Sequence, residues 1–390
     1  MMKSTAGRLT SSSSTDQGIG IVEFLQGNNF FITGATGSLG KVLVEKIFRS
    51  TPKVGKVFLL VRGKDKQEAL LRVKNEIADA ALFKRLKEIH GNLFQDLMRS
   101  KVIPVVGDVC EPNLGMDTLT TAEIAEEIDV IVNSAANTTW DERYDVSLNT
   151  NAKGPARLLE FAKKCKKLKL LVHVSTAYVN GKRPGVFLEK PLCMEEEEED
   201  DEISKVEQAI HVPFLDVDSE LKLASDTMES YDGNERIQKL KELGMRRMAD
   251  PILLSYGQGA LPGFAGDPIS LVDIVSAAAA ATTTTTNNLD QKKYWKKTME
   301  RVIRLAQLYE PYTFTEARFD MENTKKVMEE MCGEEVTDFG FEVESISWEY
   351  YFKTIHLPGL RRHALKLKLK QPLAVAAAAP TPTPRPGSRM

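Results

Sequence analysis

Cysteine is scarce in this 390-residue sequence, and the few cysteines that occur lie far apart. The four positions are Cys110, Cys165, Cys193 and Cys332, with no Cys-x-x-Cys pair and no Cys/His ligand spacing. The five histidines are equally scattered. This spacing excludes zinc-finger ligand sets and a dense disulfide framework, so we expect a reducing compartment and no metal site.

Long apolar runs and a large excess of one charge are also missing. No stretch of about 18 apolar residues occurs, so we expect no transmembrane helix. The net charge is -3 and the pI is about 6.1, which gives no basic field that would favour a nucleic-acid partner. The chain is 42% hydrophobic, enough for a sizeable core, and its length predicts one large and one small domain.

Three segments have compositions that argue against a packed fold. Residues 1–17 are rich in Ser and Thr and contain one acid, Asp16, which suits either a transit-peptide remnant or a disordered leader. Residues 277–290 begin with an Ala run and a Thr run and are expected to be a linker. Residues 367–390 contain an Ala run and Pro-Thr repeats, so we expect a disordered tail.

Short apolar runs alternate with segments of helical periodicity in the first half of the chain. The expected strands are Asn29–Thr33, Val57–Val61, Val102–Val106, Asp129–Asn133 and Leu170–Val174. The expected helices are Lys41–Arg49, Gln67–Leu97 with a break near His90, Asn151–Lys167 and Ser219–Leu243. This alternation predicts an α/β fold, a doubly wound parallel Rossmann sheet, followed by a small helical unit over residues 291–366.

A glycine-rich turn lies between the first expected strand and its helix. It has the spacing Gly-x-x-Gly-x-x-Gly and comprises Thr33, Gly34, Ala35, Thr36, Gly37, Ser38, Leu39 and Gly40. Glycines at these positions let the backbone turn sharply and approach a pyrophosphate, which the helix N-terminus then faces. Because the turn opens a strand–helix unit, we predict a dinucleotide site that includes all of these positions except Ala35.

The end of the second expected strand points to the type of nucleotide. NAD enzymes usually carry an acid there for the ribose hydroxyls, but this chain has Arg62, which suits the 2′-phosphate of NADPH. A solvated strand end is the alternative. After the third strand, Asp108 and Val109 are expected near the adenine, although a turn-forming Asp explains that position nearly as well.

Further segments resemble short-chain dehydrogenases of the extended type. Asn133–Ala136, which includes Ala135, ends the fourth strand as in that superfamily, and Asn149–Gly154, which includes Asn151, opens the next helix. Val174–Gly181 resembles the active-site strand. The resemblance implies that Thr176 is the hydroxyl that hydrogen-bonds the substrate carbonyl, and that Ala135 and Asn151 lie at the cofactor.

A narrower resemblance is to plant alcohol-forming fatty acyl-CoA or acyl-carrier-protein reductases of the male-sterility type. The segments that carry it are Gly18–Gly27, Asn133–Leu148, Phe161–Leu170, His173–Arg183, Arg318–Met331 and Ser347–Lys366. It implies an NADPH-binding domain over residues 18–276 and a C-terminal domain over residues 291–366. It also implies two reductions of a long-chain acyl-CoA or acyl-ACP to a primary alcohol, in lipid, wax or pollen-wall formation. A plastid location is implied, with the cytoplasm or the endoplasmic-reticulum surface as alternatives.

The Tyr-x-x-x-Lys motif on which this family's catalysis depends is missing. Of the nine tyrosines only Tyr178 has a lysine four residues on, Lys182, and Gly181 between them argues against the required helix. The segment ending at Arg247, which precedes the catalytic helix in the family, runs straight into Met248 and sequence that resembles a later part. We therefore expect an internal deletion near residues 247–248. The alternative function is a catalytically inactive chain that still binds NADPH.

Two rival functions have weaker support, and one basic segment has two possible roles. A sugar epimerase or ketone reductase would not explain the C-terminal resemblance at Ser347–Lys366. A cysteine nucleophile at Cys110 has no obvious partner base in the sequence. Residues 361–370 alternate basic residues with leucine, which fits either peripheral contact with an anionic membrane or a solvated helix end.

Overall fold

The structure is a computed structural model that describes residues 18–139, 141–177, 185–190, 192–195, 210–213, 216–248, 317–359 and 362. The chain divides into two compact units, Met1–Cys332 and Gly333–Met390. Several expected features lie outside the described residues: the leader, Tyr178 with Lys182, residues 249–316 and the C-terminal tail.

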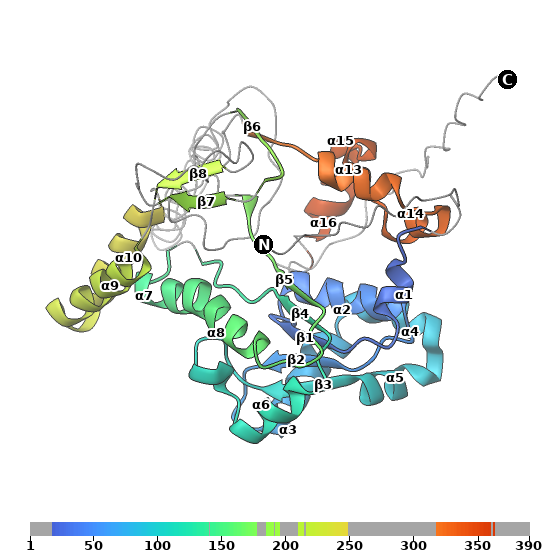
Figure 1. Cartoon of the computed structure of the whole chain (residues 1–390), viewed down its shortest axis with the longest axis horizontal. Coiled ribbons are helices and arrows are strands. Elements are labelled where there is room, and N and C mark those ends of the chain that lie inside the picture. The colour runs from blue at the N-terminus through green and yellow to red at the C-terminus, as the bar shows by residue number, and fades with distance from the viewer. Residues whose placement is uncertain are drawn as a thin grey trace, which may run out of the picture. The chain divides into compact units, whose positions relative to one another are not determined.

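A five-stranded parallel sheet forms the centre of the first unit (Figure 1), in the order β3-β2-β1-β4-β5. Its strands are β1 Phe30–Thr33, β2 Val57–Val61, β3 Val102–Val106, β4 Val130–Asn133 and β5 Leu170–His173. All five were expected from the sequence and are confirmed within one residue at either end. The order reverses between β1 and β4, where doubly wound sheets bind their ligands.

Helices cover both faces of this sheet. The helices are α2 Ser38–Ser50, α3 Lys66–Arg72, α4 Lys84–His90, α5 Phe94–Lys101, α6 Thr118–Ala125, α7 Tyr144–Ser147 and α8 Lys153–Ala162. Successive strand residues point to opposite faces, so Ile32 joins the core beneath α2 to α5 while Phe31 joins the core beneath α6 and α8. Phe31 there packs against Phe161, with ring centroids 5.0 Å apart. The predicted doubly wound fold is confirmed.

Short elements complete the described part of the first unit. They are α1 Ile21–Leu25, η1 Val73–Ala78, η2 Ala81–Phe83, η3 Gly91–Leu93, η4 Pro112–Gly115 and η5 Leu148–Ala152. Two small parallel sheets pair β6 Gly185–Phe187 with β9 Ala317–Phe319, and β7 Leu192–Glu195 with β8 Ile210–Pro213. Helix α13, Glu322–Glu329, follows β9. The expected break in the second helix is confirmed at Gly91, whose φ of +51° ends α4, but the helix is also interrupted at Asp79 and Ala80, between η1 and η2.

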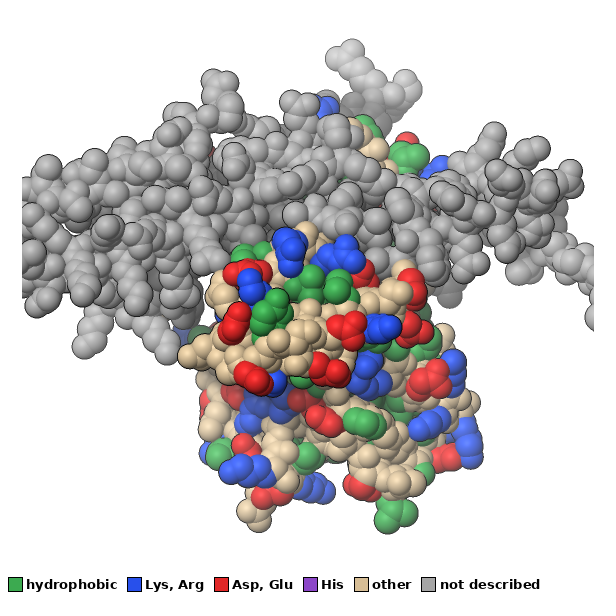
Figure 2. Space-filling model, turned by 90° about the vertical axis from the view of Figure 1, so that its left-hand side faces the viewer, with side chains coloured by type: hydrophobic (Ala, Val, Ile, Leu, Met, Phe, Trp, Pro, Cys, Tyr) green, Lys and Arg blue, Asp and Glu red, His purple; other side chains and the backbone are tan. Residues whose placement is uncertain are grey.

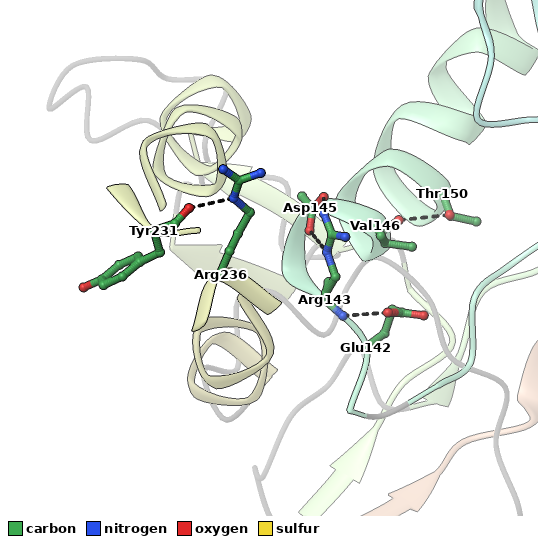
Figure 3. A network of polar contacts seen from close by, with 7 residues as sticks. All are labelled: Glu142, Arg143, Asp145, Val146, Thr150, Tyr231 and Arg236. Carbon is green, nitrogen blue, oxygen red and sulfur yellow. Dashed lines mark hydrogen bonds and ion pairs between the residues drawn. The ribbon is translucent and has the colours of Figure 1, made fainter. Parts of the chain in front are cut away.

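The helical structure expected over Ser219–Leu243 is confirmed, but not as one continuous helix. Two helices occur instead, α9 Val217–Ser230 and α10 Gly233–Met248 (Figure 3). Gly233 adopts φ +52°, and the Arg236 side chain donates to the Tyr231 carbonyl at 2.7 Å, which closes the connection. Figure 2 shows the side of the molecule on which these two helices lie in Figure 1. On that side, acidic and basic side chains of the described residues are interspersed.

A buried contact attaches this helical hairpin to the sheet domain. Tyr144 and Leu148 pack against Ala224 and Leu243 in a small core of their own. Buried Glu220 accepts from the Tyr144 hydroxyl at 2.7 Å and pairs with Arg247. The hairpin is therefore fixed to α7 and η5, the segment that borders the carboxyl ends of the strands.

The β5 edge of the sheet is apolar and open to solvent. Among the described residues β5 pairs with β4 alone. Leu170, Val172 and Val174 remain 42%, 39% and 37% exposed, unusually high for a Rossmann strand. These alternate residues share one face of the sheet, which lacks a covering helix in the described part at this position.

The second unit contains short helical elements. They are α14 Gly333–Phe339, η9 Val343–Ser345, α15 Trp348–Tyr350, η10 Tyr351–His356 and α16 Leu357–Gly359. Within it, Trp348 and Tyr351 have ring centroids 6.0 Å apart. Of the small helical unit expected over residues 291–366, the described part is helical in residues 322–329 and in short elements over 333–359, whereas Ala317–Phe319 form strand β9.

Candidate cofactor-binding site

The glycine turn brings the chain between β1 and α2 against the end of β4. Gly34 has φ +70°, and a Cβ there would lie 2.7 Å from backbone atoms of Ser134 and Ala135. The Gly37 amide donates to the Gly34 carbonyl at 2.9 Å and closes the turn. No other residue type fits Gly34, because both the backbone conformation and the close approach exclude a side chain.

Helix α2 presents an uncapped N-terminus at this turn. Gly37 is its N-cap residue, no side chain caps it, and its first turn contains no acid. The first amides of such a helix are free to bind an anion. A Cβ at Gly40 would lie 2.4 Å from the Gly34 carbonyl oxygen, so this glycine lets the helix pack onto the turn.

A groove of about 580 Å³ runs along the carboxyl ends of β1 to β4. Parallel sheets place their ligands at this edge. Its lining residues are Thr33, Gly34, Thr36, Gly37, Leu60, Val61, Arg62, Arg72, Gly107, Asp108, Val109, Cys110, Ser134, Ala135, Ala136, Asn137, Thr138, Thr139, Glu142, Val146 and Thr150.

Two arginines line the β2 end of the groove. Arg62 is exposed, and the Arg72 Nη1 donates to its carbonyl at 2.8 Å. Glu76 accepts from the Arg72 Nε at 2.7 Å, and this hydrogen bond raises the pKa of Arg72. Arg72 was not found from the sequence. It lies ten residues beyond Arg62, so only the fold brings the two cations together.

Asp108 and Val109 line the groove after β3, as predicted. The Asp108 carboxylate accepts from the Cys110 amide at 2.9 Å, so it stabilises its own turn as the alternative interpretation proposed. The Cys110 thiol lies 3.2 Å from the Thr150 hydroxyl oxygen. Burial raises the pKa of Cys110, which favours the thiol over the nucleophilic thiolate.

Polar side chains join the ends of β1, β4 and β5. The Thr33 hydroxyl donates to Asn133 Oδ1 at 2.7 Å, and Asn133 Nδ2 lies 2.9 Å from His173 Nδ1. The Ala135 amide donates to the Thr33 hydroxyl oxygen at 3.1 Å. The Ser134 hydroxyl donates to the Thr33 carbonyl at 2.8 Å. These bonds fix the turn after β1 to the loop after β4.

Asn151 holds the far wall of the groove without lining it. Its side chain accepts from the Asn137 amide at 2.8 Å and donates to the Asn137 carbonyl at 2.9 Å. This paired contact fixes the segment that follows β4, which lines the groove with Asn137, Thr138 and Thr139. Asn151 therefore acts on the groove by positioning its wall.

Thr176 is buried just beyond the end of β5, at 7% exposure, and does not line the groove. Of the predicted site residues, the groove brings together Thr33, Gly34, Thr36, Gly37, Arg62, Asp108, Val109 and Ala135. Ser38 and Leu39 lie in the first turn of α2, beside the lining but outside it.

A second cavity, of about 620 Å³, lies between η5 and α9. Cys110, Val146 and Thr150 line both this cavity and the groove, so they separate the two. Figure 3 shows Thr150 donating to the Val146 carbonyl at 2.9 Å, which stabilises this shared wall. This cavity was not predictable from the sequence, because η5 and α9 are far apart along the chain.

The doubly wound sheet and its glycine-lined groove define a dinucleotide-binding domain of the short-chain dehydrogenase kind. The sequence matches the family described as male sterility protein, over residues 32–234 with its NAD-binding domain and over residues 277–367 with its second domain. The chain belongs to this family and is an oxidoreductase by descent. The resemblance to fatty acyl-CoA reductases seen in the sequence is confirmed.

The relatives are reductases by name. An Arabidopsis thaliana protein named fatty acyl-CoA reductase 2, chloroplastic, is 34% identical over 500 aligned positions, covering 90% of this chain and 80% of the relative. A Simmondsia chinensis protein named alcohol-forming fatty acyl-CoA reductase is 49% identical over 177 residues, 45% of this chain and 36% of that protein. The terminal R domain of the myxalamid pathway is a solved structure with TM-score 0.36 and 27% identity, covering 43% of this chain and 40% of that chain.

The described helices are all too short or too polar to cross a membrane. Residues 361–370, where membrane contact was considered, lie almost entirely outside the described part.

Proposed function

We propose that this chain binds NADPH in the groove and is a fatty acyl-CoA reductase that forms primary alcohols from long-chain acyl thioesters. The observation that carries the proposal is the groove itself, with a glycine turn after β1, Arg62 after β2 and Arg72 on α3. The names of the relatives support the reaction. A carrier-protein thioester is an alternative substrate of the same chemistry.

The residues present fit a phosphorylated nicotinamide nucleotide. The uncapped α2 N-terminus and the glycine turn suit the pyrophosphate, and Arg62 with Arg72 suits a 2′-phosphate. When bound, NADPH supplies the hydride for both reductions. Thr176, to which the family resemblance assigns the substrate carbonyl, is buried and does not line the groove, so the groove as described does not present its hydroxyl to a substrate.

A nucleotide titration tests the cofactor. We expect NADPH to bind more tightly than NADH, because NADH lacks the phosphate that the two arginines would contact. Arg62→Ala should weaken NADPH binding by about tenfold or more and leave NADH nearly unchanged, since one charge-assisted contact is worth about 1.5–3 kcal/mol. Lys64→Ala, a nearby exposed cation that does not line the groove, is the matched control. Equal affinity for the two nucleotides would remove the argument from Arg62.

A second candidate function is nucleotide binding with little turnover. No tyrosine in the sequence except Tyr178 is followed by a lysine four residues later. The alignment with the Arabidopsis relative has 500 positions, more than the 390 residues of this chain, so it includes positions with no counterpart here. The outer side of β5, with which none of the described residues pairs, also fits a sheet that has lost its next strand. These observations support an internal deletion, for which the sequence resemblance suggested a position near residues 247–248.

A product assay separates the two candidates. Loss of a general acid costs about 10²–10⁴ in rate, so we expect alcohol formation far below that of an intact relative. Turnover equal to that of the relative would exclude the second candidate. Sequencing the transcript across Arg247–Met248 then shows whether a longer form restores Tyr-x-x-x-Lys.

A plastid location is part of the proposal, because the relative with the broad alignment carries "chloroplastic" in its name. Chloroplast import of the full chain fused to a fluorescent protein tests it. Fluorescence confined to the cytoplasm or the endoplasmic-reticulum surface would support one of the alternatives.

A further inference from the structure

His173 ends a hydrogen-bonded chain that crosses three neighbouring strands. The chain runs from the Thr33 hydroxyl on β1, through the Asn133 amide on β4, to the His173 imidazole on β5. Thr33 and Asn133 are buried, whereas His173 is exposed at the sheet edge. The reaction described above gives His173 no task.

The direction of this chain follows from the single hydrogen of the Thr33 hydroxyl. The Ala135 amide donates to the hydroxyl oxygen, and the hydroxyl hydrogen has Asn133 Oδ1 as its acceptor, which a flipped Asn133 amide would take away. The Asn133 NH₂ group is thereby turned toward His173 Nδ1. Because an amide NH₂ only donates, Nδ1 has to accept, which requires a neutral imidazole with its proton on Nε2.

The surroundings of His173 favour that neutral form. Although the residue is exposed at the sheet edge, its ring is partly buried where Nδ1 contacts Asn133, and this partial burial lowers the pKa of His173 below the ordinary value of 6.5. On β4, the strand paired with β5, the residue in register is Asn133, which does not titrate. If the imidazole were protonated, its Nδ1–H group would face the NH₂ group of Asn133, and two donors would oppose each other. The alternative is a flip of the Asn133 amide, which would leave the buried Thr33 hydroxyl without its acceptor.

The other end of the chain is the glycine turn. Thr33 directly precedes Gly34, which packs against the backbone of Ser134 and Ala135. The Thr33 hydroxyl and the Ala135 amide join these two segments, and both residues line the groove. A change in the Asn133 amide therefore alters the wall that the nucleotide contacts.

We propose that neutral His173, protonated on Nε2, is a positioning residue for the glycine turn. It does not line the groove; it orients Asn133 and through it Thr33, and its protonation weakens nucleotide binding. The proposal rests on the nucleotide site proposed above. Binding is strongest above about pH 6.5 and declines as the pH falls through the lowered pKa of His173.

The tautomer is measurable without any nucleotide. Long-range ¹H–¹⁵N spectra of the histidine-labelled chain should show an unprotonated Nδ1 and a protonated Nε2 for His173, with the resonances assigned by their loss in His173→Asn. Asn133→Leu removes the donor and should release the tautomer preference. An Nδ1-protonated His173 in the unsubstituted chain overturns the proposal.

NADPH titrations at about pH 7.5 and about pH 5 test the consequence. His173→Asn keeps an acceptor near Nδ1 but does not titrate, so it should retain affinity within about twofold at the higher pH. The unsubstituted chain should lose about tenfold more affinity than this variant at the lower pH. His173→Leu, which has no acceptor, should bind about tenfold more weakly at both.

The 2′-phosphate of NADPH also titrates, with a second pKa of about 6. Because this titration affects binding to every variant equally, it cancels when the variants are compared at the same pH. His356→Asn, a histidine of the second unit, is the matched control and should behave as the unsubstituted chain. Equal pH dependence in the unsubstituted chain and His173→Asn overturns the positioning role while the nucleotide site stands. Absence of NADPH binding in every variant overturns the proposed function, and the tautomer spectrum then decides the orientation of Asn133.

Discussion

Gly34 is subject to two constraints, a positive φ and a close backbone contact, whereas Gly27 is subject only to the first. Both adopt a positive φ, +70° and +71°, but a Cβ at Gly34 would meet backbone atoms at 2.7 Å, whereas at Gly27 nothing lies within 4 Å. Gly27→Ala should therefore lower the free energy of unfolding by the conformational term alone, about 1–2 kcal/mol. Gly34→Ala should lower it by more than about 2 kcal/mol, because the backbone of Ser134 and Ala135 has to move as well.

Urea denaturation of the two variants measures this difference, and NADPH titration measures its effect on the groove. Gly27→Ala should retain binding, since Gly27 does not line the groove, whereas Gly34→Ala should lose it. Equal destabilisation by the two substitutions would show that the approach to β4 contributes nothing.

Residues whose role depends on local spacing were predictable from the sequence. Gly34, Gly37 and Arg62 follow from the order strand, turn, helix, strand, because parallel strands end at one edge. Arg72 was not predictable, since its spacing to Glu76 also describes an ordinary solvated helical pair. His173 was missed for a similar reason. Only the pairing of β4 with β5 places it opposite Asn133.

The α9–α10 hairpin depends on one buried carboxylate. Glu220 is 4% exposed, while the Arg247 side chain that pairs with it is 32% exposed. Arg247→Met leaves the Glu220 carboxylate buried without this cation, which should cost about 3 kcal/mol or more of unfolding free energy. Glu220→Gln should cost less, about 1–2 kcal/mol, because Arg247 reaches solvent.

Hydrogen exchange of residues 217–248 together with urea denaturation tests this order. Exchange in the hairpin should rise more in Arg247→Met than in Glu220→Gln. Lys239→Met, which removes a surface pair with Glu242 within the same hairpin, is the control. If Glu220→Gln destabilised the hairpin more than Arg247→Met does, an unpaired buried carboxylate at Glu220 would not be the source of the destabilisation.

At the scale of elements, the strands were easier to predict than the helices. Strands β1, β2 and β4 are short runs of apolar residues buried on both faces, so burial and sequence agree there. The α9–α10 connection was missed because Tyr231 and Asp232 do not interrupt helical periodicity strongly. The break depends on the positive φ of Gly233 and on packing of both helices against Tyr144 and Leu148.

For the whole molecule, the open β5 edge is the feature with the widest consequence. Among the described residues nothing pairs with the outer side of β5, and Leu170, Val172 and Val174 are exposed on one face. An exposed apolar edge strand is a template for pairing with a second chain. If the sheet has lost its next strand through a deletion, as proposed, self-association follows from the same cause as the low turnover.

Val172→Lys tests that connection. A lysine at this position introduces a charge that edge-to-edge pairing would have to bury, so self-association should fall in light scattering over a concentration series. Stability should change by only about 0.5 kcal/mol, because Val172 is already exposed. Leu119→Lys on α6 adds the same charge at a more exposed apolar site away from the edge and should leave association unchanged. If self-association persisted in Val172→Lys, the contact would lie elsewhere on the molecule. Self-association would then not be a consequence of a strand lost beside β5.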